Sequence, residues 1–268
     1  MVLLQDLNPS QAEELLNMFA EGESLEAINS SLALHLVDLA RELGRDALVG
    51  RLLKHAADVS TSDEDLGWCQ FELMKYDGST MEEMVGLAMQ SSNDGLVGLA
   101  AGIYHHLALM TVGSDDAETF ANRSMQLRVE NDDIEGMIYG HALLAHIAKT
   151  NQKWEVSKLH LTKRLEIIPE SEKFERMEAL ADLAHTHTTM NELEDAQKRL
   201  ISSLEIAEEI QDLSGILVAK WGLADLAEIS NQPDEAMVQL SDIMTAFMEA
   251  GEIAPPAVSA RVEKLTSS

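Results

Sequence analysis

The fold is decided by a stretch that the chain repeats three times: LLAHIAKTNQKWEVS at residues 143–157, LADLAHTHTTMNELEDA at 180–196 and LADLAEISNQPDEA at 223–236. In each copy a Leu-Ala pair is followed, twelve residues after the alanine, by a second small residue. The copies are offset by 39 and then 40 residues, and a period of this length is typical of a solenoid of stacked helical pairs. The paired small residues are Ala145 and Ser157, Ala184 and Ala196, and Ala224 and Ala236.

Apolar residues recur at spacings of three and four along nearly the whole chain, and no sustained alternation indicates strands. Clusters of Gly, Asn, Asp, Ser and Pro interrupt this pattern and mark the turns. We therefore expect an all-α protein, with a short capping helix reaching about residue 265. The other expected helices cover residues 10–22, 24–43, 45–59, 62–76, 80–90, 93–112, 117–130, 134–149, 154–168, 172–189, 193–210, 213–230 and 234–250.

The repeated small residues have a packing role in this interpretation. A small residue on the first helix of a pair lets the second helix approach closely, and the small residue twelve positions later is its counterpart. The bulky residues Leu161, Leu200 and Leu240 are then expected to fill the space toward the next pair.

These residues resemble the tetratricopeptide repeat family, in its longer variant with a period near 40. The resemblance is good over residues 117–251, looser over 1–116, and leaves 252–268 as a capping helix on one domain spanning 1–268. It implies a right-handed superhelical solenoid of about six antiparallel hairpins plus that C-terminal cap. HEAT and armadillo repeats have similar periods, so the repeat class stays open at this point.

The resemblance also implies a concave groove lined by the first helix of each pair. In this register His146, His185 and Asp225 occupy equivalent inward sites, so the third copy carries an acid where the first two carry histidine. Lys149 would then hold a carboxylate of the partner, and Asp225 with Glu228 would hold a basic side chain. The inward residues expected to contact a protein or peptide are Tyr139, His146, Lys149, Glu178, His185, Thr188, Val218, Trp221, Asp225 and Glu228.

The charge balance is strongly acidic, with 47 acidic and 19 basic residues and a net charge of −28. This argues against binding nucleic acid or an anionic membrane, which require clusters of Lys and Arg. It favours a basic protein or peptide partner, unless the acid excess serves mainly for solubility. Nine of the basic residues lie between Lys149 and Arg199, and this band either docks on an acidic face of another copy or forms salt bridges on the helix surfaces.

No motif for catalysis, metal binding or a cofactor is present in the sequence. His141 and His146 are five residues apart, and His185 and His187 are two apart, so neither pair faces a single point on a helix. The glycine-rich stretch from Gly95 lacks the Lys-Ser/Thr ending of a phosphate loop. We expect no enzyme, no metal and no cofactor.

From the sequence we expect no transmembrane span and no secretory signal, and its single cysteine, Cys69, lies in an apolar helical stretch. A cytoplasmic location is therefore the default expectation. The favoured function is a scaffold or adaptor that binds a peptide or protein segment. A ligand-responsive regulatory sensor and a chaperone for an assembling or secreted partner are the alternatives, and self-association stays open.

Overall fold

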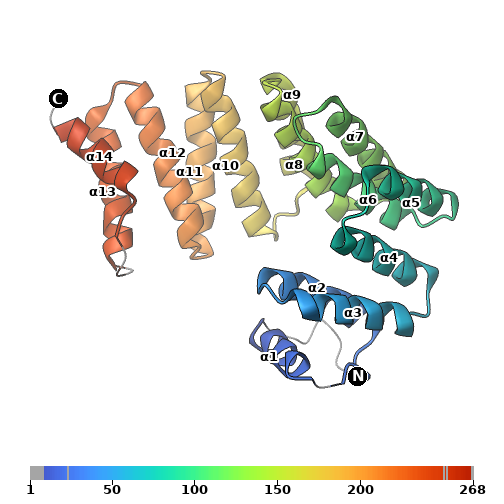
Figure 1. Cartoon of the computed structure of the whole chain (residues 1–268). Coiled ribbons are helices and arrows are strands. Elements are labelled where there is room, and N and C mark those ends of the chain that lie inside the picture. The colour runs from blue at the N-terminus through green and yellow to red at the C-terminus, as the bar shows by residue number, and fades with distance from the viewer. Residues whose placement is uncertain (1–8, 23, 250, 252, 267–268) are drawn as a thin grey trace. The chain divides into compact units, whose positions relative to one another are not determined.

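The computed structural model describes residues 9–22, 24–249, 251 and 253–266, and within them it contains fourteen α-helices and no strand (Figure 1). The protein is all-α, and helices that are consecutive in the chain pack against one another in a solenoid-like helical repeat. The helices are α1 (Pro9–Ala20), α2 (Ser30–Glu42), α3 (Asp46–Val59), α4 (Asp63–Asp77), α5 (Met81–Asn93), α6 (Val97–Met110), α7 (Asp115–Glu130), α8 (Ile134–Thr150), α9 (Trp154–Ile167), α10 (Lys173–Thr189), α11 (Leu193–Glu209), α12 (Leu213–Ile229), α13 (Pro233–Glu249) and α14 (Pro256–Thr266).

Two helices begin at least four residues later than the sequence pattern predicted. α2 begins at Ser30 rather than at residue 24, because the side chain of Asn29 caps it by accepting a hydrogen bond from the N–H of Leu32. The turns before Asn29 bury Leu25 and Ile28. α6 begins at Val97 rather than at residue 93, because a turn with Gly95 at a φ of +81° separates it from α5.

The chain divides into two compact units. Unit 1 comprises Met1–Thr111 and Thr119–Asp132, and unit 2 comprises Val112–Glu118 and Asp133–Ser268. The expected single domain over residues 1–268, with its division at residues 116 and 251, stays a prediction.

Unit 1 has two main helical pairs, α2 with α3 and α5 with α6. Leu16, Leu52 and Leu53 are fully buried where α1, α2 and α3 meet. Farther along, Leu99, Ile103 and Leu107 form the buried face of α6.

Unit 2 contains the three predicted pairs, α8 with α9, α10 with α11 and α12 with α13. First helices begin at residues 134, 173 and 213 and second helices at 154, 193 and 233, so both sets carry the offsets of 39 and 40. The paired small residues at the six repeat positions have no exposed surface, and the three following leucines are also buried. The sequence register and its packing interpretation are therefore confirmed.

Five turns in the described part of the chain contain a non-glycine residue with positive φ. Three of them, Gln152, Asn191 and Asn231, end the first helix of each pair and repeat at the same offsets. Asn tolerates this left-handed conformation better than most residues because its side chain bonds locally. The turn that reverses the chain within each pair is thus a repeated structural element as well.

Candidate functional site

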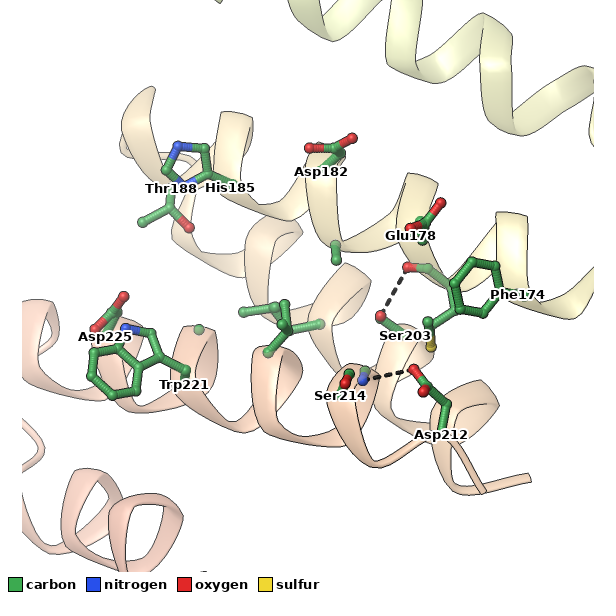
Figure 2. Close-up of a pocket in the computed structure, with 16 residues that line it drawn as sticks. Phe174, Glu178, Asp182, His185, Thr188, Ser203, Asp212, Ser214, Trp221 and Asp225 are labelled. Carbon is green, nitrogen blue, oxygen red and sulfur yellow. Dashed lines mark hydrogen bonds between the residues drawn. The ribbon is translucent and has the colours of Figure 1, made fainter. Parts of the chain in front are cut away.

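A cleft of about 630 Å³ opens between α10 and α12, with α11 as its floor (Figure 2). α10 and α12 are the first helices of successive pairs, and they contact each other directly. The lining residues are Phe174, Met177, Glu178, Ala181, Asp182, His185 and Thr188 of α10, Leu200 and Ser203 of α11, Asp212 before α12, and Ser214, Gly215, Val218, Trp221, Gly222 and Asp225 of α12.

Two glycines let α12 come close to its neighbours and so shape the cleft. A Cβ added at Gly222 would lie 2.7 Å from Cδ2 of Leu200, and one added at Gly215 would collide with Sδ of Met177. The buried hydroxyl of Ser203 donates a hydrogen bond to the carbonyl oxygen of Met177 at 2.9 Å and ties α11 to α10. The floor of the cleft is therefore fixed by close helix contact.

Carboxylates occupy the α10 wall of the cleft. Asp182 accepts a hydrogen bond from Nζ of Lys149 at 2.8 Å, and a guanidinium nitrogen of Arg164 lies 3.6 Å from it. The same guanidinium lies 3.7 Å from Glu178, which is beyond hydrogen-bond reach. Arg164 is buried, and its Nε has no hydrogen-bond partner. The buried positive charge of Arg164 therefore stabilises the carboxylates of Glu178 and Asp182.

The carboxylate of Asp212 has a structural role at the opposite side of the cleft. It caps α12 by accepting a hydrogen bond from the N–H of Gly215 at 2.7 Å. Asp133 caps α8 in the same way through the N–H of Gly136, so the turn before the first helix repeats with its acid and its glycine. This Asp-x-x-Gly recurrence is the sequence signal that places Asp212 at the cleft.

Asp225 is held by an arginine of the last helix. Arg261 of α14 lies 2.8 Å from Oδ1 of Asp225, donates a second hydrogen bond to Glu228 at 2.8 Å, and its guanidinium carbon lies 4.8 Å from the ring centroid of Trp221. Burial raises the pKa of Asp225 above its usual range, and the nearby Arg261 opposes that effect. Arg261 thus fills the place that the sequence suggested for a basic side chain of a partner.

The structure brings together six of the ten contact residues predicted from the sequence. Those lining the cleft are Glu178, His185, Thr188, Val218, Trp221 and Asp225. The other four lie outside this lining: Tyr139, His146 and Lys149 on α8, and Glu228 on α12. Lys149 and Glu228 are already paired within the chain, with Asp182 and Arg261.

Phe174, Met177 and Leu200 also line the cleft and were not predicted as contact residues. Phe174 is half exposed, and in Figure 2 its ring lies at the opposite end of the cleft from Trp221. No repeated sequence feature marks Phe174, and the repeat predicted Leu200 only as a leucine that fills the space toward the next pair. They become part of a site only because α10 and α12 lie side by side on α11.

The central basic band is largely used inside the chain. Six of its nine members lie within 4 Å of a carboxylate, and Arg176 donates to the carbonyl oxygens of Leu165 and Ile168. This arrangement favours the salt-bridge interpretation of the band over docking on another copy. The six are Lys149, Lys153, Lys158, Arg164, Lys173 and Lys198.

Among the described residues, no three His, Cys, Asp or Glu side chains gather so as to hold a metal ion. A histidine pair lies away from the cleft, with Nδ1 of His141 3.0 Å from Nδ1 of His160. Burial raises the pKa of the Cys69 thiol to about 11, so that group stays protonated.

Comparison with models of protein families gave no match, and comparison with curated proteins gave none either. In the part of the chain that the structure describes, no helix has both the length and the apolar character needed to cross a bilayer.

Proposed function

We propose that this protein is a non-enzymatic interaction scaffold of the tetratricopeptide-like class, and that it binds a peptide or protein segment in the cleft between α10 and α12. The cleft itself supports this proposal most directly. Phe174 and Val218 are 50% and 58% exposed inside a hollow of about 630 Å³, next to the half-buried ring of Trp221. Aromatic and aliphatic groups held in a concave site are typical anchors for a bound segment.

The polar groups of the cleft favour binding over catalysis. The Ser203 hydroxyl donates to a backbone carbonyl, and Asp212 accepts from the backbone at the start of α12. Neither group is available as a nucleophile or a general base in this arrangement. The exposed carboxylates and the ring of His185 would instead orient a ligand by hydrogen bonds.

The test uses the full chain as bait to capture partners and then measures their affinity by calorimetry. Trp221→Ala combined with His185→Ala should weaken binding by about tenfold or more, because it removes an aromatic anchor and a polar contact. Leu159→Ala combined with Val238→Ala is the matched control, since both side chains are exposed on second helices outside the cleft. Unchanged binding of every captured partner to the cleft variant would refute the proposal.

We also propose a cytoplasmic location. Cys69 is buried with its thiol free, which suits a reducing compartment. Fractionation of cells that produce the protein checks this location.

A further inference from the structure

We propose that the segment bound in the cleft is cationic and amphipathic, with an arginine or lysine on Glu178 and Asp182 and an adjacent apolar side chain on the floor between Phe174 and Trp221. This inference rests on the proposed function, because it names the ligand class of the same cleft.

The carboxylates at the cleft are more exposed than the cations of Lys149 and Arg164. The side chains of Glu178, Asp182 and Asp225 are 49%, 43% and 44% exposed. The cations behind them are covered, since Lys149 is 19% exposed and Arg164 only 6%. No Lys or Arg is among the described residues that line the cleft. A ligand that enters therefore meets carboxylates first.

The carboxylate of Glu178 can accept hydrogen bonds from a ligand more readily than Asp182 or Asp225, each of which has a cation at 2.8 Å. Its only cationic neighbour in the described chain is the guanidinium of Arg164 at 3.7 Å, too far for a hydrogen bond. Asp182 lies four residues farther on α10, so both carboxylates project from one side of the helix. Two acceptors in this spacing suit the fork of a guanidinium or the ammonium of a lysine.

At the other side of the cleft, Asp225, Glu228 and the Trp221 ring already bind a guanidinium, that of Arg261. A basic residue of the ligand is therefore not expected there. The contacts of Arg261 with Asp225, Glu228 and the Trp221 ring combine charge, hydrogen bonding and cation–π attraction. Because α14 already supplies this cation, an incoming basic residue is left with the α10 wall. The pair Glu178 and Asp182 therefore replaces Asp225 and Glu228 as the expected contact for a basic partner.

The apolar residues that line the cleft predict an apolar side chain in the ligand. Met177 and Leu200 are buried members of the cleft lining. The half-exposed Phe174 ring and the Trp221 ring lie at opposite ends of the cleft (Figure 2). A purely hydrophilic cation would leave the exposed surface of the Phe174 and Trp221 rings uncovered, so the ligand needs an apolar side chain beside its charge. The net charge of −28 adds a long-range attraction for such a segment.

The test is selection of random twelve-residue peptides on the full chain, followed by affinity measurement for the enriched peptides at low and high salt. Sequences that combine Arg or Lys with an adjacent apolar residue should be enriched. Their affinity should fall several-fold between 50 and 300 mM salt, because the charges are partly exposed. Glu178→Gln should weaken binding about fivefold to tenfold, and Phe174→Ala by a similar factor.

Matched controls separate this inference from the proposed function. Glu205→Gln and Ile201→Ala remove an exposed charge and an exposed apolar group from α11 outside the cleft, and they should leave affinity unchanged. Enrichment of acidic or uncharged peptides that still depend on Phe174 would overturn the cationic ligand but keep the binding cleft. Enrichment without any dependence on cleft residues would overturn both.

Discussion

At the residue scale, the contact between the buried His141 and the partly buried His160 makes the stability of the protein sensitive to acid. The two Nδ1 atoms lie 3.0 Å apart, so one ring accepts and must be neutral. Burial lowers the pKa of His141 to about 4, helped by His160 and Lys163. Burial and Lys163 also lower the pKa of His160, while Glu118 opposes that shift.

The sign of the pH effect follows from these lowered pKa values. The unfolded chain takes up protons on histidine near pH 6.5, whereas the folded chain resists until about pH 4. The stability that depends on neutral His141 is thus complete above pH 6.5 and is lost as the pH falls toward 4. We expect this residue alone to contribute about 2 kcal/mol to the loss of unfolding free energy between pH 7 and pH 5.

Urea unfolding of His141→Gln at both pH values measures this contribution. The variant should lose less stability than the parent on going from pH 7 to pH 5. His146→Gln is the control, because this ring is exposed on the same helix. An equal pH dependence in parent and His141→Gln would contradict the assignment.

At the scale of a helix, the sequence predicts most where the chain repeats. Starts of the six helices from α8 to α13 follow the offsets of 39 and 40, because the same small residues must meet in each pair. α2 lacks such a constraint. Ser24 and Asn29 are both acceptable helix caps, and the burial of Leu25 and Ile28 in the core decides for Asn29.

The candidate site, too, could be predicted from the sequence only where the chain repeats. The inward positions of α10 and α12 follow from the repeat, and six of the ten predicted residues line the cleft. Phe174 lies in the first turn of α10, outside the repeated phrase, and its place depends on which helices adjoin. Arg261 could not be foreseen as the partner of Asp225, because α14 has no counterpart elsewhere in the repeat.

The contacts of α14 through Arg261 should stabilise the end of the helical array. Arg261→Met should lower the free energy of unfolding by about 1–2 kcal/mol, because partly buried Asp225 loses its cation. Arg261→Lys should recover part of this loss, since an ammonium restores the charge but not both hydrogen bonds. Fluorescence of Trp221 should also shift in the Met variant, because the guanidinium leaves its ring.

The control for α14 is Lys198→Met, which removes an exposed ion pair with Asp195 at 3.7 Å. A pair of this kind contributes little, so unfolding of this variant should match that of the parent. Equal losses in Arg261→Met and Lys198→Met would show that the α14 contacts do not hold the end of the array.

At the scale of the whole molecule, the division into two compact units predicts that they fold separately. In a helical repeat, most stabilising contacts join neighbouring helices, so a cut between pairs removes only one set of them. The fragment 112–268 contains all of unit 2 together with the rest of α7. We expect this fragment to be helical and monomeric and to unfold cooperatively.

The cleft lies entirely within that fragment, since its lining runs from Phe174 to Asp225. Affinity for a peptide selected on the full chain should therefore change by less than about threefold, which calorimetry can resolve. A fragment ending at residue 211 keeps α10 and α11 but lacks the α12 wall, and it should lose binding while retaining helical circular dichroism. If the longer fragment folded but bound no peptide, residues of unit 1 would have to contribute to the site, and the cleft alone could not account for recognition.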